Sequence, residues 1–345
     1  MGTVSLCMIV RDEEAVLGRC LDRVRGRVDE IILADTGSRD RTREIGAAYG
    51  AKICDFPWRD DFAAARNFAF SKGTMDYLLW LDADDLLPKS TAGALRTLAD
   101  GKSDLVMLPY HTGFDSRGRC SFWCWRERLV RREAGFRWVG AVHECIVPAG
   151  RVTRADFPVE HRPGEKPRSD RNLRILQRQL EQTGTLPPRE RYYYGRELLE
   201  QGQKAEAAAQ FAAFLRDPGG WGPDRTAARR LLAGCTEDPE RRLELLLAGL
   251  GEGPPEPGLC CDLGRELLEQ GRPEAAEFWF RTAMTRPEPP GFVCEEERRL
   301  LPAIWLTVCR DRLGDRSGAL GWHRLARQLA PAHPAVLHND RYFGL

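Results

Sequence analysis

The chain has 345 residues, enough for two ordinary domains, and its 52 basic and 51 acidic side chains give a net charge of +1. A balance so close to neutral creates no overall field that would attract nucleic acid or a membrane surface, so any charged ligand must be recognised locally. The apolar run at residues 4–10 has no basic segment before it and ends at Arg11-Asp12-Glu13-Glu14, which fits neither a signal peptide nor a membrane span. The eleven cysteines are therefore expected to be reduced thiols of a cytoplasmic protein.

The predicted elements of the first half alternate between strand and helix. Residues 4–10 form an apolar run typical of a buried strand, and residues 15–24 follow with apolar positions at helical spacing. A second strand is predicted at residues 30–34, a helix at residues 41–49, and a short third strand at residues 51–54. This order predicts a parallel sheet with right-handed crossovers.

Two polar features follow these strands. The second strand ends at Asp35, and Gly37 permits a tight turn into the next helix. Further along, Arg66 lies among small residues in a helix predicted from residue 62 to residue 69. An arginine at this place either pairs with a surface acid or reaches the phosphate of a nucleotide, and the local pattern does not decide between them.

The stretch from Tyr77 to Pro88 organises the rest of the first half. Its apolar residues read as a buried strand of a parallel sheet that stops at Asp82, Asp84 and Asp85. Open α/β sheets bind ligands at the carboxyl ends of their strands, and crowded carboxylates there suit a hard divalent cation that carries a phosphorylated ligand. The alternative is an acidic helix start, with Asp85 capping a helix after Pro88.

Two more strands are predicted, at residues 104–110 and 122–132. Aromatic residues alternate along the second, and they are candidates either for a sugar or peptide platform or for packing of the sheet. A basic cluster in the same strand either grips pyrophosphate or forms a solvated face. The platform candidates are Trp123, Trp125 and Trp138, and the basic cluster is Arg126, Arg128, Arg131 and Arg132.

Four motifs in the same order resemble family 2 glycosyltransferases of the GT-A fold. They are Met8-Ile9-Val10-Arg11-Asp12-Glu13-Glu14, Asp35-Thr36-Gly37-Ser38-Arg39-Asp40-Arg41-Thr42, Ala65-Arg66-Asn67 and Leu81-Asp82-Ala83-Asp84-Asp85. More narrowly, the chain resembles a bacterial branch joined to tetratricopeptide-type helices, which includes peptide S- and O-glycosyltransferases acting on bacteriocin precursors. The resemblance covers roughly residues 3–175 and implies an α/β, Rossmann-like GT-A domain with a mostly parallel sheet.

The resemblance implies roles for the matching positions. Asp82 and Asp84 match the DxD motif, which binds ribose and, through Mg²⁺ or Mn²⁺, the pyrophosphate of a nucleotide sugar; Asp85 is an alternative metal ligand to Asp84. Asp12 departs from the asparagine that relatives commonly carry. The implied nucleotide-binding residues are Val10 and Arg11 in the pocket, Asp35 at the base, Arg66 beside the nucleotide, and Asp82.

Residues 136–144 resemble the aromatic-Val-Gly-x-Val-His-Glu segment of the family. The resemblance implies that His143 completes the metal shell or orients the donor. Glu144 is the candidate general base, which would take the acceptor proton in an inverting displacement. Glu127 and Asp115 remain rivals for that role, and the spacing does not decide among them.

Residues 159–173 resemble the closing segment of the same family. His161 is a candidate third metal ligand, and Arg168 stands where relatives carry a lysine that neutralises phosphate, although the two cations are not equivalent. The Pro/Gly-containing cationic loop suits a lid that closes over the donor and excludes water. A plain linker would have the same composition.

From residue 172 onward the strand pattern gives way to helical spacing. Residues 194–202 and 263–271 share the sequence Gly-Arg-Glu-Leu-Leu-Glu-Gln-Gly, and their first glycines, Gly195 and Gly264, lie 69 positions apart. This offset is close to twice the tetratricopeptide period of about 34 residues and predicts about four helix-turn-helix repeats. We therefore expect a GT-A domain at residues 1–175 and a helical repeat domain at residues 176–345 that binds an acceptor polypeptide, a partner or a second copy of the chain.

The leading hypothesis is an inverting, metal-dependent glycosyltransferase of the hexosyltransferase class, with a UDP-sugar donor and a peptide or protein acceptor. Glycosyl transfer needs the developing charge of a leaving nucleoside diphosphate to be neutralised, which a metal site achieves. Three alternatives remain: a small-molecule or polysaccharide acceptor, a nucleotidyltransferase, and a non-enzymatic tetratricopeptide scaffold. The second would normally carry a Gly-rich phosphate loop with a lysine near the first strand, which this chain lacks.

Overall fold

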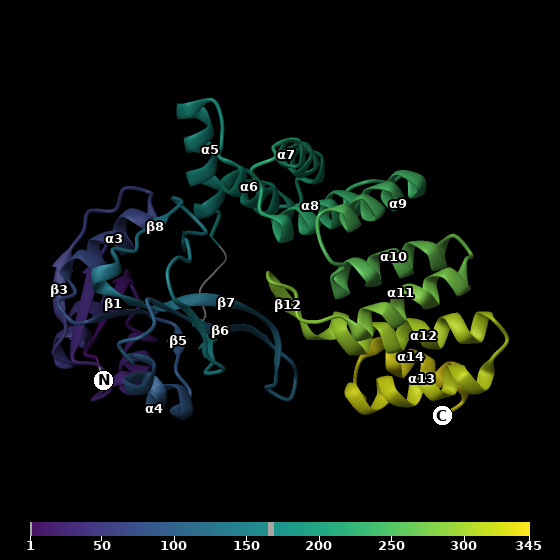
Figure 1. Ribbon diagram of the computed structural model, residues 1–345, viewed down its shortest axis with the longest axis horizontal. Helices are drawn as coiled ribbons and strands as arrows, with labels where there is room; N and C mark the ends of the chain where they lie inside the picture. Colours follow the sequence, from purple (N-terminus) through teal and green to yellow (C-terminus); the bar gives the residue numbers. More distant parts are fainter. Residues whose placement is uncertain (1, 165–168) are drawn as a thin grey trace. The chain divides into compact units, whose positions relative to one another are not determined.

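The computed structural model describes residues 2–164 and 169–345, and the chain divides into two compact units, Met1–Thr185 and Leu186–Leu345. The first is an α/β unit and the second is built of helices (Figure 1). The boundary predicted after residue 175 lies inside helix α5 (Arg171–Thr183), which belongs to the first unit.

The first unit alternates strands and helices as the apolar runs predict. Its strands are β1 (Val4–Val10), β2 (Glu30–Asp35), β3 (Lys52–Asp55), β4 (Tyr77–Trp80), β5 (Asp85–Leu86), β6 (Leu105–Phe114), β7 (Cys120–Arg131), β8 (Trp138–Val139), β9 (Cys145–Ile146), β10 (Val152–Arg154) and β11 (Val159–His161). Its helices are α1 (Leu17–Val24), α2 (Thr42–Ala48), α3 (Phe62–Lys72), α4 (Lys89–Leu98) and α5, with a 3₁₀ turn at Arg132–Ala134.

The main sheet has the strand order β3-β2-β1-β4-β7-β6-β11-β5, with β10 also beside β6. The first four strands are parallel, as the βαβ pattern requires, whereas β7 runs antiparallel to both β4 and β6. The short strands β8 and β9 form a separate antiparallel pair. The mostly parallel α/β GT-A class predicted from the sequence is therefore confirmed.

Both faces of this sheet are buried. Successive side chains of a strand point to opposite faces, so the residues of β4 divide between two core clusters. In β4, Tyr77 and Leu79 belong to one core cluster together with residues of α1 and α4. Leu78 and Trp80 belong to a second cluster together with residues of α3. The continuous apolar run of β4 thus reflects a strand covered by helices on both sides.

The strand pairing also brings distant residues to one edge. The parallel pair β1 and β4 end at Val10 and Trp80, so the segments that follow both strands meet beyond the same end of the sheet. Strand β11 pairs antiparallel with β5, which sets His161 opposite Asp85. Asp85 begins β5 and does not cap α4, whose N-terminus has no side-chain cap. The capping alternative is therefore wrong.

The second unit consists of successive antiparallel helices. They are α6 (Pro188–Glu200), α7 (Lys204–Arg216), α8 (Gly222–Gly234), α9 (Pro239–Ala248), α10 (Pro257–Glu269), α11 (Pro273–Thr285), α12 (Leu301–Arg312), α13 (Arg316–Leu329) and α14 (Pro334–Phe343), with the short strand β12 (Phe292–Cys294), a 3₁₀ turn at Gly249–Gly251 and a π-helical turn at Glu296–Leu300. The two repeated segments occupy equivalent parts of α6 and α10, which agrees with the predicted repeats.

Each repeated glycine permits a close helix crossing. A Cβ added to Gly195 would lie 2.7 Å from the ring of Phe211 in α7, and one added to Gly264 would lie 2.7 Å from the ring of Phe280 in α11. Both phenylalanines are fully buried. The glycines therefore recur because the same ring occupies the space that a side chain would need. Among the described residues, no helix is both long enough and apolar enough to cross a membrane.

Candidate active site

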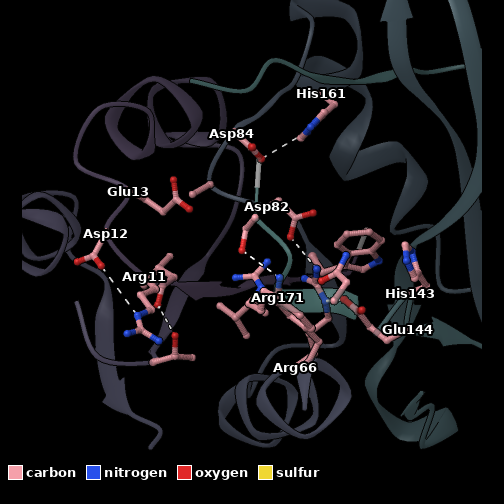
Figure 2. Close-up of a pocket in the computed structure, with 18 of the residues that line it drawn as sticks. Arg11, Asp12, Glu13, Arg66, Asp82, Asp84, His143, Glu144, His161 and Arg171 are labelled. Atoms are coloured by element: carbon pink, nitrogen blue, oxygen red, sulfur yellow. Dashed lines mark hydrogen bonds and ion pairs between the residues drawn. The ribbon is translucent and has the colours of Figure 1, made fainter. Parts of the chain in front are cut away.

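A cavity of about 670 Å³ lies beyond the ends of β1 and β4. Figure 2 shows that its charged residues point toward a common space from several separate segments of the first unit. The residues that line it are Ile9, Val10, Arg11, Asp12, Glu13, Thr36, Trp58, Phe62, Arg66, Trp80, Asp82, Ala83, Asp84, Tyr110, Arg126, His143, Glu144, His161, Ser169, Arg171 and Asn172.

Most of the site residues proposed from the sequence are brought together here. Those that line the cavity are Val10, Arg11, Arg66, Asp82, Asp84, His143, Glu144 and His161. Asp85 lies directly behind this wall, and Asp35 supports a turn beside it. Arg168 lies outside the described residues.

One end of the cavity carries two adjacent carboxylates and an imidazole. His161 Nδ1 lies 3.5 Å from Asp84 Oδ1 and 3.8 Å from Asp85 Oδ1, and one ligand atom from each residue falls within 4.8 Å of the others. Burial acts to lower the pKa of His161, but the two carboxylates raise it to about 10. Carboxylate oxygens with one imidazole nitrogen form a donor set that suits a divalent cation such as Mn²⁺.

The second carboxylate of this group is fully buried and held by an arginine. Arg128 Nη1 donates to Asp85 Oδ2 at 2.7 Å, and neither side chain is exposed. Burial acts to raise the pKa of Asp85, but Arg128 outweighs it and lowers the pKa to about 2. Asp85 Oδ1 and His161 Nδ1 are buried and have no hydrogen-bond partner among the described residues. Because native proteins rarely leave such atoms unpaired, these two atoms fit a cation site.

A second ionic group lies elsewhere in the same cavity. Arg66 Nε donates to Glu144 Oε1 at 2.5 Å, and Arg66 Nη2 donates to Asp82 Oδ1 at 2.7 Å. The guanidinium of Arg66 lies 4.8 Å from the ring of Trp80 and 4.9 Å from the ring of Trp138. Burial acts to raise the pKa of Glu144, but the neighbouring Arg66 lowers it. Glu144 is thus an ionised carboxylate at the cavity wall.

This arrangement corrects two interpretations of single residues. Trp138 is 2% exposed and packs against Arg66 and Trp80, so it cannot serve as a sugar or peptide platform. His143 lies next to Glu144 and is absent from the group of Asp84, Asp85 and His161. The structure therefore does not bring His143 to the other proposed metal ligands.

The segment that carries His143 and Glu144 is held in a strained conformation. His143 has φ of +51°, in the left-handed region that residues with a Cβ seldom adopt. Asn67 of α3 forms two hydrogen bonds of 2.9 Å with the backbone of Trp138, and the amide of Phe62 donates to the carbonyl of Ala141. Helix α3 therefore positions this segment through backbone contacts, and strain maintained in this way is common at functional sites.

The turn after β2 forms another wall. Asp35 accepts hydrogen bonds from the amide and hydroxyl of Ser38 at 2.9 and 2.7 Å, and from Arg43 at 2.6 Å. Burial acts to raise the pKa of Asp35, but these donors lower it. Asp35 does not line the cavity, whereas the adjacent Thr36 does. The carboxylate predicted to meet a nucleobase therefore orders the turn.

Asp12 has a structural part in the same turn. Its carboxylate accepts from the amide of Arg39 at 2.7 Å, and its own amide donates to Ser38 Oγ. Its φ is +52°, a conformation that aspartate and asparagine tolerate better than most residues. Asp12 thus joins the segment after β1 to the turn after β2, and it adds a charge to the cavity wall.

Several cavity residues were not identified from the sequence. Tyr110, Trp58, Phe62 and Arg171 come from four different segments, and single aromatic or basic residues carry no local signal. Arg126 and Arg128 lie two positions apart in β7 and therefore on the same face of the strand, so strand alternation does not distinguish them. In β7, Arg126 reaches the cavity and Arg128 is buried behind it.

Comparison with known proteins agrees with the geometry. Residues 5–155 match the family model described as glycosyl transferase family 2. A TPR repeat-containing protein of Synechococcus elongatus is 31% identical over 332 residues, which cover 95% of this chain and 66% of the relative. The prophage-derived glycosyltransferase SunS of Bacillus subtilis is 27% identical over 224 residues, which cover 57% of this chain and 49% of SunS. The chain thus spans about two thirds and about half the length of these two relatives.

Solved structures similar to parts of the chain include two kinds of protein. Glucosyl-3-phosphoglycerate synthase of Mycobacterium tuberculosis, in complex with Mn²⁺, UDP and phosphoglyceric acid, has a TM-score of 0.28 and 23% identity, covering 32% of this chain and 43% of the synthase. YrrB, a TPR protein with an unusual peptide-binding site, has a TM-score of 0.39 and 17% identity, covering 49% of this chain and 81% of YrrB.

Proposed function

We propose that this chain, in which residues 5–155 form a domain of glycosyl transferase family 2, transfers a sugar from a nucleotide-sugar donor to an acceptor. The observation that carries the proposal is one cavity with two different acidic groups beyond the ends of β1 and β4. Asp84, Asp85 and His161 form a cation site, whereas Asp82 and Glu144 are bound by Arg66.

We assign the donor to the wall made by Val10, Arg11 and Asp82. A UDP-sugar is the donor that the family resemblance favours, with its ribose at Asp82. Arg66 donates to Asp82 Oδ1, and its Nη1 is buried without a hydrogen-bond partner among the described residues. Arg66 therefore orients Asp82, the residue assigned to the ribose of the nucleotide.

The cation proposed here is Mg²⁺ or Mn²⁺, held by Asp84, Asp85 and His161. When bound, it neutralises the charge that develops on the leaving nucleoside diphosphate. Asp85 Oδ1 and His161 Nδ1 are buried and make no hydrogen bond among the described residues, which supports this assignment. The proposed contribution of Arg168 concerns a residue outside the described part of the chain. Arg171 at the cavity wall is a described cation that can meet the same phosphates.

Glu144 is the proposed general base of an inverting displacement. Its carboxylate lies at the cavity wall, and Arg66 keeps it ionised, so it can accept a proton from the acceptor group. Arg66 also joins Glu144 to Asp82, so the base and the ribose contact share one guanidinium. This connection would hold the base at a constant position relative to the donor.

We propose a peptide or protein side chain as the acceptor. The support is the helical unit, whose paired helices offer an extended surface, and the similarity to SunS, a glycosyltransferase. Self-association of the chain through the same helices is the alternative use of that surface. A cytoplasmic location is part of the proposal, because all eleven cysteines are free thiols, as a reducing compartment would keep them.

The proposal is tested by calorimetric titration of UDP-, GDP- and dTDP-sugars into the full chain, once with Mn²⁺ and once with a chelator. We expect one nucleotide sugar to bind with Mn²⁺ and its binding to be lost with the chelator. Absence of binding for all three would contradict the proposal and would favour a scaffold built on the helical unit. A nucleotide sugar that binds and is slowly hydrolysed in the absence of an acceptor would be the donor to use when peptides are tested as acceptors.

A further inference from the structure

Arg128 occupies an unusual position behind the cavity. Its side chain is fully buried, and its guanidinium lies 3.7 Å from the ring of Trp80 and 4.2 Å from the ring of Tyr110. Nη1 donates to Asp85 Oδ2 at 2.7 Å and lies 3.3 Å from the carbonyl oxygen of Trp80. Two aromatic rings and the backbone thus prevent this guanidinium from following Asp85 if that side chain turned.

The two oxygens of Asp85 have different surroundings. Oδ2 accepts from Arg128 and from the amide of Asp82 at 3.0 Å, so its hydrogen-bonding capacity is used. Oδ1 is buried, makes no close hydrogen bond among the described residues, and forms an ion pair with His161 Nδ1 at 3.8 Å. Because the two close hydrogen bonds of this carboxylate are both made by Oδ2, the orientation of Asp85 is imposed from that side.

The backbone around Asp85 adds to this restraint. The amide of Asp85 donates to the carbonyl of Asp82, which closes the turn that follows β4, and residue 85 pairs with His161 across β5 and β11. The amide of Arg162 donates to the carbonyl of Asp84. The main chain therefore fixes the positions of Asp84 and Asp85, and the guanidinium of Arg128 sets the direction of the Asp85 carboxylate.

Trp80 separates two arginines that hold different aspartates. Arg66 lies 4.8 Å from its ring and pairs with Asp82, whereas Arg128 lies 3.7 Å from its ring and pairs with Asp85. Arg66 occupies one oxygen of Asp82, and Arg128 occupies Oδ2 of Asp85 while Oδ1 of Asp85 faces His161. The three neighbouring aspartates therefore cannot act as equivalent ligands.

We propose that Arg128 is a positioning residue that makes Asp85 a one-oxygen ligand of the divalent cation, through Oδ1, beside Asp84 and His161 Nδ1. The proposal rests on the proposed function for the presence of a cation. It assigns Asp85 to the cation and Asp82 to the ribose side of the cavity. Partners that orient a metal ligand from behind commonly change metal affinity about 10- to 100-fold when they are removed.

Whether removal of Arg128 weakens or tightens cation binding distinguishes a positioning role from the effect of its positive charge alone. If Arg128 acted only as a positive charge near the cation, its removal would relieve repulsion and tighten cation binding. If it orients Asp85, its removal lets the carboxylate turn, and cation binding weakens. A purely structural role would lower stability and leave the cation affinity of the folded protein unchanged.

The test measures Mn²⁺ binding from the electron paramagnetic resonance signal of free Mn²⁺, with Mn²⁺ alone and with Mn²⁺ plus UDP. We compare the full wild-type chain with Arg128→Met, Asp85→Asn and the control Arg131→Met. Arg131 lies on the same strand, 3.4 Å from Asp104 and 5.8 Å from the ring of Tyr77, and has no contact with Asp85. We expect about tenfold weaker Mn²⁺ binding in Arg128→Met and Asp85→Asn, and wild-type affinity in Arg131→Met.

Equal or tighter Mn²⁺ binding in Arg128→Met would overturn the proposal, as would a wild-type chain that binds no Mn²⁺ under either condition. If Arg128→Met does not fold, Arg128→Lys decides, because lysine keeps the charge but lacks the planar group that packs between the two rings. A smaller loss in the same direction supports positioning, and unchanged affinity overturns it. Binding of Mn²⁺ without binding of any nucleotide sugar would refute the proposed function and leave this inference standing.

Discussion

The two units use the same pairing of arginine with carboxylate for different purposes. In the helical unit, Arg230 bridges Asp262 at 2.6 Å and Glu297 at 2.5 Å, which ties α8 to α10 and to the turn before α12. Arg310 of α12 pairs with Glu277 of α11 in the same way. In the first unit, Arg66 and Arg128 pair with aspartates, but Arg66 Nη1 makes no hydrogen bond among the described residues, and His161 Nδ1 meets Asp84 and Asp85 only as ion pairs at 3.5 and 3.8 Å.

A ligand site and a structural ion pair differ in how completely their polar atoms are hydrogen-bonded. In an ion pair between helices, every charged group can be fully paired, because the function of the ion pair is to stabilise the packing of the helices. A ligand-binding site must keep some polar atoms without hydrogen bonds, and this lowers the stability of the protein until the ligand binds. Unpaired buried atoms that converge on one cavity are therefore better evidence of a site than charged residues as such.

The strongest test of this contrast removes the carboxylate of Asp84 from the proposed cation site of Asp84, Asp85 and His161. Asp84→Ala should lower kcat/KM for sugar transfer by about 10³-fold, because neutralisation of the leaving group is worth several kcal/mol. Steady-state kinetics with the donor identified by calorimetry would measure it, and circular dichroism would verify the fold. The control Asp22→Ala removes a carboxylate that accepts from Tyr49 outside the cavity and should keep wild-type activity. Unchanged turnover in Asp84→Ala would refute the metal assignment.

The Arg66 group should respond in kcat. Glu144→Gln retains a side chain that can accept from Arg66 and loses the proton acceptor, so kcat should fall by about 10²-fold or more while donor affinity changes little. Parallel measurement of kcat and of the donor dissociation constant separates the two effects. A loss of donor affinity with little change in kcat would make Glu144 a binding residue and leave the base to be found elsewhere.

The helical unit should respond in stability alone. Arg230→Met leaves Asp262 and Glu297 facing each other without their cation, and should destabilise this unit by about 2 to 4 kcal/mol, since about a quarter of the arginine side chain is exposed. Hydrogen exchange of the amides of α8 and α10 measures the change. Arg241→Met is the control: its pair with Glu244 is exposed and worth well under about 1 kcal/mol. Loss of nucleotide-sugar binding in Arg230→Met would break the contrast between the units.

The smallest expected effect concerns an imperfectly paired acid of the helical unit. Burial raises the pKa of Asp224 to about 6 although Arg189, 3.8 Å away, and Arg196 act to lower it. The folded state therefore binds more protons than the unfolded state between about pH 4 and pH 6, and stability falls as the pH rises through this window. Asp224→Asn should remove this fall and stabilise the unit by about 1 to 3 kcal/mol at pH 8.

Thermal unfolding of wild type and Asp224→Asn at pH 4, 6 and 8 checks this prediction. The two proteins should be closest at pH 4, where the wild-type carboxyl is protonated in both states. A variant that is less stable than wild type at pH 8 would mean that the pairing with Arg189 outweighs the burial of the charge. The ion pair of Asp224 with Arg189 would then stabilise the helical unit, as the ion pairs of Arg230 are proposed to do.

Sequence patterns predicted the framework because it depends on local regularities. The apolar runs of β1, β2 and β4 and the repeated segments of α6 and α10 each carry their own periodicity. The position of Asp82, Asp84 and Asp85 followed from the end of one strand. Family resemblance added Arg66, Glu144 and His161, all of which line the cavity.

The division of labour inside the site could not be predicted, because it depends on tertiary pairing. The sequence offered Arg126, Arg128, Arg131 and Arg132 as one basic cluster, yet only packing decides that Arg128 meets Asp85 while Arg126 reaches the cavity. Likewise, nothing local shows that Asp35 is occupied by Ser38 and Arg43, or that a backbone turn directs His143 away from Asp84.

The glycine and phenylalanine pairs of the helical unit have an evolutionary consequence. Gly195 with Phe211 and Gly264 with Phe280 share the same spacing along the chain and the same close approach. A segment bounded by equivalent points of these two pairs could be duplicated or deleted by recombination, and each new junction would still set a glycine against a phenylalanine ring. Such a change would therefore alter the number of helix pairs while the close approach of glycine and phenylalanine is kept at its junction.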